Sequence, residues 1–333
     1  MAEAASGVSA AQVQAELTRT SAWLSRVEAQ LQAIVVADNP FVTEAAQHVL
    51  AAGGKRLRPV LVRLAAQFGT GPIDDQSLDA AALVVELTHV ASLYHDDVMD
   101  DAELRRGVAS ANARYGNSVA ILTGDYLFSR ASALVSKLGV DYVALQADTF
   151  ARMVQGQIAE LKGPGPGVDP MSHYLKVLDD KTGALIATSA VFGGMVAGLP
   201  QAELDALGRF GDALGLAFQL DDDLLDITSD TTGKRPGTDL RQGVATLPLL
   251  LLARSSDTAD QALVAGIAAG LSDDDVADAL ATLRAHPVIE QAHGVIAGYA
   301  AQAKAELVNL PDCPAKSALA TLVDNMTSRV RAV

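Results

Sequence analysis

The sequence predicts an all-α protein, and three observations support this fold class. Half of the 333 residues are hydrophobic, largely Ala, Leu and Val, and aromatic residues make up only 4%, which suits packed helices better than sheets. Apolar residues recur with helical spacing along most of the chain. We see neither the period-2 alternation typical of strands nor a GxGxxG sequence. We therefore expect a single-domain helical bundle over 1–333, with peripheral N-terminal helices over about 1–40.

The expected helices follow one another closely. The first runs from about residue 10 to 36, and the second begins near Thr43 and breaks at Gly53-Gly54. It resumes after Pro59, because proline is tolerated in a first helical turn. The sequence GPGPG at 163–167 is interpreted as a surface loop rather than a domain linker. The remaining expected helices are 75–101, 118–138, 140–161, 172–178, 183–197, 202–228, 246–254, 259–271, 273–284, 288–307 and 317–330.

Composition limits the partners and the compartment. A formal charge of −15 argues against nucleic acid as a partner. Cys313 is the single cysteine, which excludes an internal disulfide and suits a reducing interior. The N-terminus shows no signal-peptide pattern. Residues 182–202 carry no charge, but they include four glycines and Pro200, so we favour a buried helix over a transmembrane span.

Two copies of one acidic motif point to the chemistry. The run 96–100 reads DDVMD and the run 222–226 reads DDLLD. On a helix, the first and last Asp of each run share one face. Carboxylates gathered in this way repel one another unless a cation lies among them, and Mg²⁺ bridges a few carboxylates to substrate phosphates. The motifs therefore predict a Mg²⁺-dependent enzyme that acts on a diphosphate.

Basic residues form a matching series. The run 53–59 reads GGKRLRP, with glycines that permit close approach of an anion to a helix start. Arg105-Arg106 follows the first acidic run, and adjacent arginines serve either as ion pairs to Asp or as diphosphate ligands. Lys181-Thr182 and the run 233–239 (GKRPGTD) are weak signals individually, since a lone lysine in a loop is usually only solvated.

In combination these motifs are specific. Their order is GGKRLRP, HDDVMD with RRG, KTG, FQLDDDLLD and GKRPGTDL. The chain thereby resembles the trans-type isoprenyl diphosphate synthases, which include farnesyl, geranylgeranyl and longer polyprenyl diphosphate synthases, over about residues 53–248. The resemblance implies a helical bundle of the isoprenoid synthase type with a central active-site cavity. It also implies a homodimer that condenses isopentenyl diphosphate with an allylic diphosphate.

The resemblance also assigns roles by position. Three Mg²⁺ ions would be held by Asp96, Asp100 and Asp222, with Asp97, Asp223 and Asp226 in support or as further ligands. The allylic diphosphate and the catalytic step would involve Arg105, Lys181, Thr182, Gln219 and Lys234. The diphosphate of isopentenyl diphosphate would be held by Lys55, Arg58, His89 and Arg106. By spacing alone, an Asp97–Asp101 register is equally allowed for the first motif.

Product length depends on the residues one and two helical turns before Asp96. Short-chain members of the family close the pocket with a bulky aromatic residue at the first level, whereas this chain has small residues there. The residues expected to line this wall are Ala91, Ser92, Thr88 and Leu87. We therefore expect a product longer than C15, that is, C20 or longer. Such a long apolar product suggests a transient encounter with a membrane for product release. We expect a cytoplasmic enzyme without a transmembrane span.

Two departures from the family pattern keep alternatives open. Val244 stands where the family usually has a lysine, and Gly156-Gln157 stands where Gly-Glu is common. A catalytic-type or regulatory subunit of a heteromeric prenyl synthase is therefore an alternative. A terpene cyclase or head-to-head synthase is less favoured, because the second acidic run is a full DDLLD and GGKRLRP is intact.

Overall fold

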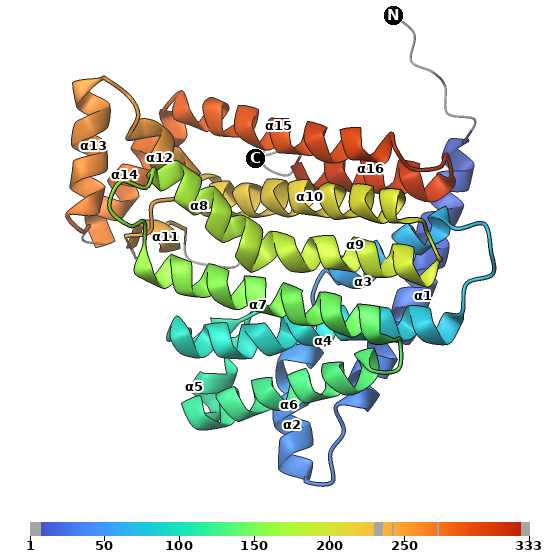
Figure 1. Cartoon of the computed structure of the whole chain (residues 1–333). Helices are drawn as coiled ribbons and strands as arrows, with labels where there is room; N and C mark the ends of the chain where they lie inside the picture. The colour runs from blue at the N-terminus through green and yellow to red at the C-terminus, as the bar shows by residue number, and fades with distance from the viewer. Residues whose placement is uncertain (1–7, 230–235, 242, 272, 328–333) are drawn as a thin grey trace, which may run out of the picture. The chain divides into compact units, whose positions relative to one another are not determined.

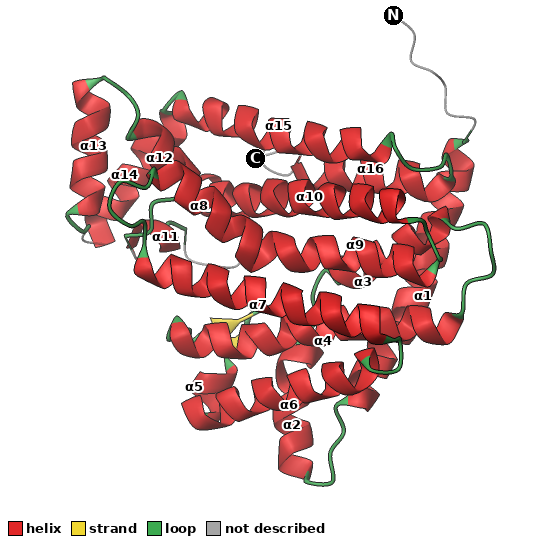
Figure 2. Cartoon of the chain, in the orientation of Figure 1, coloured by secondary structure: helices red, strands yellow, loops and turns green. Residues whose placement is uncertain are grey.

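A computed structural model describes residues 8–229, 236–241, 243–271 and 273–327. Helices make up most of it, and the one β ribbon of the described residues is the small yellow element in Figure 2. The predicted all-α class is confirmed. The helices up to the ribbon are α1 (Ala10–Ile34), α2 (Pro40–Ala51), α3 (Leu57–Ala65), the 3₁₀ turn η1 (Ala66–Phe68) and α4 (Asp75–Met99). The ribbon and the next helices are β1 (Leu104–Arg105), β2 (Val108–Ala109), α5 (Ala111–Tyr115), α6 (Asn117–Val135) and α7 (Val140–Lys162).

In the described residues after α7, the regular elements are all helical (Figure 1). After α7 come α8 (Pro170–Leu178), the π turn η2 (Asp179–Gly183), α9 (Ala184–Val196), α10 (Gln201–Thr228) and α11 (Thr238–Arg241). The π turn separates α8 from α9. They are followed by α12 (Leu247–Leu252), α13 (Thr258–Ala268), α14 (Asp273–Ala285), α15 (Val288–Leu307) and α16 (Pro314–Thr327).

The chain divides into two compact units, each with its own core. Unit 1 holds the described residues of Met1–Ala151, Leu185–Arg209 and Leu307–Leu319. Unit 2 holds those of Arg152–Ala184, Phe210–Glu306 and Ala320–Val333. The single domain with a central cavity, expected from the sequence, stays a prediction.

In unit 1, α4 packs mainly against α3 and α6. The helix begins where Asp74 accepts hydrogen bonds from the backbone and the hydroxyl of Ser77, which satisfies donors that a helix start leaves open. Helix α1, in the N-terminal region, contacts α3 and α4. Trp23 on α1 is buried, and its indole donates to the Asp79 carboxylate of α4 at 2.7 Å.

Unit 2 contains two apolar clusters. One joins α8 and α10 to α12 and α15, with Leu220, Leu224 and Leu250 among its buried members. The other joins the end of α10 to α11 through α15, with Leu283 and Val288 fully or nearly fully buried. The GPGPG sequence forms the loop between α7 and α8 and is mostly exposed, as predicted.

The charge-free segment 182–202 is not one helix. It begins in the π turn, continues through α9, turns at Gly198 with a φ of 67°, and enters α10. Within the described residues, no helix combines the length and hydropathy that a membrane crossing demands. The β ribbon, α5, α11 and the π turn were not anticipated from the sequence, and all four are short elements.

Candidate active site

The first aspartate set lies at the C-terminal end of α4. Asp97 points inward, where it is 0% exposed and accepts a hydrogen bond from Arg105 Nε at 2.7 Å. Burial raises the pKa of Asp97, and the Arg105 guanidinium opposes that rise. Asp101 has left the helix, with a φ of 48°. Asp96 lies half-buried in the last turn of α4, and Asp100 is the exposed C-cap of that helix. The Asp96–Asp100 register stays a prediction.

Arg105 and Arg106 are positioned by the turn of the β ribbon. The strands pair antiparallel, and the turn residues Arg106 and Gly107 have φ of 52° and 79°, as a type I′ hairpin turn requires. Arg105 returns to the aspartate set, whereas Arg106 donates to the Gly53 carbonyl. A Cβ on Gly54 would lie 2.9 Å from Arg106 Cζ. Gly54, the second glycine of the GGKRLRP motif, therefore leaves space for the Arg106 side chain.

Three of the four residues expected to bind isopentenyl diphosphate gather beside this turn. Within the described part of the chain, the buried Nε of Arg58 has no hydrogen-bond partner. Burial lowers the pKa of Arg58 to about 10, while nearby Glu86 opposes the shift and Arg106 adds to it. Burial and the surrounding arginines hold the pKa of His89 well below 6.5, so this imidazole is neutral at pH 7. Lys55, the fourth residue, is exposed.

The residues expected to line the product wall lie inside α4. Leu87, Thr88 and Ala91 are buried, and Ser92 is half-buried. The Thr88 hydroxyl accepts a hydrogen bond from Gln146 Nε2 of α7 at 3.2 Å. None of these four residues is aromatic, and the Thr88 hydroxyl also donates to the Val84 carbonyl at 2.8 Å.

The second aspartate set lies near the C-terminal end of α10. Asp223 accepts hydrogen bonds from the Tyr174 hydroxyl at 2.5 Å and from Gln219 Nε2 at 2.9 Å. Burial raises the pKa of Asp223 to about 6, against the effect of these two donors. The neighbouring carboxylates of Asp222 and Asp226 also raise the pKa of Asp223. Asp222 and Asp226 are half-buried.

Asp226 also organises the chain that follows the second set. Its Oδ2 accepts from the backbone N–H of Asp239 at 3.1 Å, and its carbonyl accepts from Gly237 N–H at 2.9 Å. Val244, which replaces the usual lysine, is 43% exposed, and its N–H donates to the Asp239 carbonyl at 2.9 Å. Lys234, predicted as a diphosphate ligand, lies outside the described residues.

Lys181 and Thr182 sit in the π turn η2. Such turns are rare and occur frequently at functional sites. Lys181 Nζ donates to Glu160 of α7 at 2.6 Å, and the Thr182 hydroxyl donates to Gln219 Oε1 at 3.3 Å. Gln219 therefore links Thr182 to Asp223, so its amide is already engaged on both sides. Three of the predicted residues, Thr182, Gln219 and Asp223, thus form one hydrogen-bonded chain.

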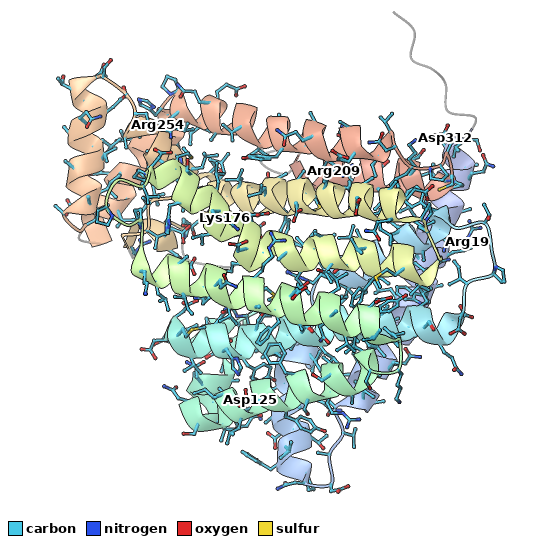
Figure 3. The ribbon with its side chains drawn as sticks, viewed as in Figure 1. Arg19, Asp125, Lys176, Arg209, Arg254 and Asp312 are labelled. Atoms are coloured by element: carbon cyan, nitrogen blue, oxygen red, sulfur yellow. The ribbon has the colours of Figure 1, made fainter. Side chains whose placement is uncertain are left out.

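An ionic cluster anchors the π turn. Arg152 of α7 donates to Asp179 at 3.0 Å and to Asp180 at 3.2 Å, and it lies 3.7 Å from the Asp212 carboxylate. Lys176, labelled on α8 in Figure 3, donates to both carboxylate oxygens of Asp180 at 2.5 and 2.6 Å. Because the turn carries Lys181 and Thr182, this cluster fixes their position.

Glycines allow the neighbouring helices to pack closely against the π turn. A Cβ on Gly156 of α7 would lie 2.7 Å from the backbone nitrogen of Lys181. A Cβ on Gly215 of α10 would lie 2.6 Å from the Cα of Gly183. Both distances are below those that real Cβ atoms show, so Gly156 and Gly215 are required by packing.

Sequence reasoning missed several residues that support this site. Glu86 had a usable signal, because it is the one charged residue in the run 81–90 (AALVVELTHV), and buried charges are almost always paired. Glu160 and Arg152 look like ordinary charges on an amphipathic helix. Tyr174 carried no signal that we can identify.

The donor set fits a divalent cation of the Mg²⁺ type. No three His, Cys, Asp or Glu side chains converge into a metal cage among the described residues. Mg²⁺ does not need such a cage, since it keeps several waters and binds through one or two carboxylates together with substrate phosphates. The hard oxygen donors of Asp96, in the last turn of α4, and of Asp100, the C-cap of that helix, fit that requirement.

Comparison with known proteins gives the family. A family model described as polyprenyl synthetase matches residues 39–285. Nonaprenyl diphosphate synthase of Mycobacterium tuberculosis is 46% identical over 312 residues, 92% of this chain and 92% of the relative. Heptaprenyl diphosphate synthase component 2 of Geobacillus stearothermophilus is 40% identical over 265 residues, 79% of this chain and 81% of the relative.

A solved structure agrees with these relatives. Geranylgeranyl pyrophosphate synthase from Corynebacterium glutamicum, complexed with calcium and isoprenyl diphosphate, has a TM-score of 0.84 at 42% identity. The match covers 94% of this chain and 97% of that one. The motifs, the helical fold and these matches agree, and the chain belongs to the polyprenyl synthetase family of trans-type isoprenyl diphosphate synthases.

Proposed function

We propose that the protein condenses isopentenyl diphosphate with an allylic diphosphate and makes an all-trans polyprenyl diphosphate of C20 or longer. The observation that carries this proposal is the cationic cluster of Arg58 and Arg106 beside a neutral His89. It offers fixed positive charge and an unused buried donor to an anion, as binding of a metal-free diphosphate requires. Lys55 completes this site from the exposed turn.

The allylic diphosphate is assigned to the aspartate sets with Arg105, Lys181, Thr182 and Lys234. Bound Mg²⁺, with three ions proposed, supplies Lewis-acid stabilisation of the charge that develops on the leaving diphosphate. Asp96, Asp100 and Asp222 would hold it. The relative complexed with calcium and isoprenyl diphosphate supports a divalent cation at this chemistry.

The other three aspartates have supporting roles in this proposal. Asp97 orients Arg105, Asp223 is held by Tyr174 and Gln219, and Asp226 organises the segment at 237–239. The protein residues need not act as strong bases. In the mechanism that the family resemblance implies, the departing diphosphate takes the proton that is lost when the isopentenyl double bond attacks the allylic cation. Water must be excluded, because it would quench that cation.

The length of the product follows from the wall of α4. Ala91 and Ser92 leave the first level below Asp96 without a bulky side chain. The relatives named for nonaprenyl and heptaprenyl products support a long chain. A long prenyl chain is poorly soluble in water, which supports a transient membrane contact that releases it. The enzyme itself is proposed to be cytoplasmic.

A homodimer is part of the proposal, supported by exposed apolar residues on α6. Leu122 is 66% exposed, and Ile121 lies next to it on the same helix. The alternative is a catalytic-type subunit that needs a partner chain. It is supported by the relative named as component 2 of a heptaprenyl diphosphate synthase and by Val244 in place of the usual lysine. Light scattering of the purified protein distinguishes monomer from dimer.

The first test is an assay of the purified protein with Mg²⁺, isopentenyl diphosphate and farnesyl diphosphate, with product length read by mass spectrometry. Products of C20 or longer that EDTA abolishes support the proposal. If dimethylallyl, geranyl, farnesyl and geranylgeranyl diphosphates all give no product, the partner-dependent subunit becomes the better explanation. In that case Val244→Lys is the first variant to make.

A further inference from the structure

We propose that Arg56 is a positioning residue for the isopentenyl diphosphate site, and that it works by holding the GGKRLRP turn and by occupying Glu86. The inference rests on the proposed function, which assigns the flanking residues Lys55 and Arg58 to that diphosphate. Arg56 lies between them, as one of the three cations of the GGKRLRP motif, and the sequence alone does not separate its role from theirs.

The guanidinium of Arg56 makes hydrogen bonds inside the protein with most of its N–H groups. Its side chain is 3% exposed. Nε and Nη2 donate to the Glu28 carboxylate of α1 at 2.6 and 2.7 Å, and Nη1 donates to Glu86 of α4 at 2.8 Å. Nη2 also donates to the Leu50 carbonyl at 3.0 Å. Four of the five N–H donors of this arginine are thus used within the protein. We therefore do not assign Arg56 to direct binding of a substrate.

The backbone at Arg56 needs such anchoring. Its φ is 48°, in the left-handed region, and it precedes α3 without a side-chain cap. Two glycines with positive φ, Gly53 and Gly54, come just before it. Non-glycine residues persist in this region when their surroundings over-determine them. Since Lys55 and Arg58 flank this strained residue, the ion pairs of Arg56 set the direction in which both of their side chains leave the turn.

Glu86 gives Arg56 a second role. Glu86 is 1% exposed and acts electrostatically on Arg58 and Arg106 as well as on Arg56. While it is bonded to Arg56, it leaves the buried Nε of Arg58 unpartnered in the described part of the chain. Without Arg56, this carboxylate would be available to pair with Arg58 or Arg106 and to compete with an incoming diphosphate. Arg56 therefore keeps the binding arginines available.

Steady-state kinetics of Arg56→Gln and Arg56→Lys test this role. We expect KM for isopentenyl diphosphate to rise about 10-fold or more for Arg56→Gln, with KM for the allylic diphosphate and kcat within about twofold of wild type. The decisive variant is the double substitution Arg56→Gln with Glu86→Gln. It should recover part of the lost affinity, because the competing carboxylate is gone, whereas a purely structural role predicts a further loss.

The control is Arg26→Gln. Arg26 also joins α1 to α4, through Asp79 at 3.0 Å, but it takes no part in the turn, so KM for isopentenyl diphosphate should not change. Melting curves show whether each variant is folded. If Arg56→Gln does not fold, Glu28→Gln loosens the same anchor more gently and should raise the same KM.

Lys55→Ala separates this inference from the proposed function. If Lys55→Ala raises KM for isopentenyl diphosphate and Arg56→Gln and Arg56→Lys do not, the role of Arg56 is wrong while the site stands. If Lys55→Ala has no effect in an active enzyme, the assignment of the site itself fails. A double variant with KM equal to or above that of Arg56→Gln overturns the role of Glu86.

Discussion

Replacing Gly156 by alanine should displace the π turn that carries Lys181 and Thr182. The new Cβ would lie 2.7 Å from the backbone nitrogen of Lys181 and 2.9 Å from the Cβ of Asp180. These neighbours are backbone or backbone-proximal atoms, so a side-chain rotation does not relieve the contact. Arg152 further restrains the turn through its ion pairs. Either α7 or the π turn must therefore move.

The expected free-energy change has two opposing parts. Glycine to alanine inside a helix favours folding by about 1 kcal/mol, whereas overpacking a tight contact costs about 1–3 kcal/mol. Gly298→Ala in α15 is the matched control, because a Cβ there meets nothing within 4 Å and only the favourable part applies. The two variants should therefore differ in unfolding free energy by about 1–3 kcal/mol.

Urea unfolding and steady-state kinetics measure the two consequences. Gly298→Ala should be slightly more stable than wild type and fully active. Gly156→Ala should be less stable than Gly298→Ala, and its KM for the allylic diphosphate should rise while KM for isopentenyl diphosphate stays unchanged. If Gly156→Ala matches Gly298→Ala in both stability and KM, the close approach at the π turn does not exist and the reasoning is refuted.

Three further predictions address unit 1 and the metal. Because the folded-state pKa of His89 lies well below 6.5, the unfolded chain binds the proton first as pH falls; stability should be full above about pH 6.5 and decline below it. Urea titrations at several pH values measure this decline. His89→Gln should make the unfolding free energy depend less on pH below about 6.5, and an unchanged pH dependence would contradict the assignment of this decline to His89. Ala91→Phe should shorten the product, as read by mass spectrometry, and an unaltered product distribution would remove Ala91 from the wall. Mg²⁺ and inorganic pyrophosphate together, at about 100 times their dissociation constant, should stabilise the protein by about 2.7 kcal/mol, or about 4 °C in Tm for a chain of this size. EDTA should reverse the shift, and no shift would count against the aspartate site.

The long helices were predictable because their signals are local. Helix α4 was expected over 75–101 and is found over Asp75–Met99, since its apolar periodicity can be read from neighbouring residues. The aspartate motifs were found for the same reason. Which carboxylate Arg105 meets was not predictable in this way, because only the fold brings Arg105 back onto Asp97.

The short elements depend on contacts between distant residues. The π turn is stabilised by Arg152 and by close packing at Gly156, both more than twenty residues earlier in the chain. The residues 179–183 themselves carry no sequence pattern that we could use to predict the turn. Similarly, Tyr174 and Glu160 acquire their roles only when α8 and α7 are placed beside Asp223 and Lys181. Helical periodicity reports burial, but it does not report which partner a polar residue will meet.

The Arg106–Gly107 turn has a consequence for how this chain tolerates changes in length. One added residue there would rotate Arg105 away from Asp97 and withdraw Arg106 from the Gly53 carbonyl in a single step. The GPGPG loop at 163–167 is mostly exposed, and it carries none of the residues assigned to the site. Exposed loops of this kind accept insertions. A reporter peptide or surface tether therefore belongs in the GPGPG loop, while the ribbon between α4 and α5 should keep its length when the protein is engineered.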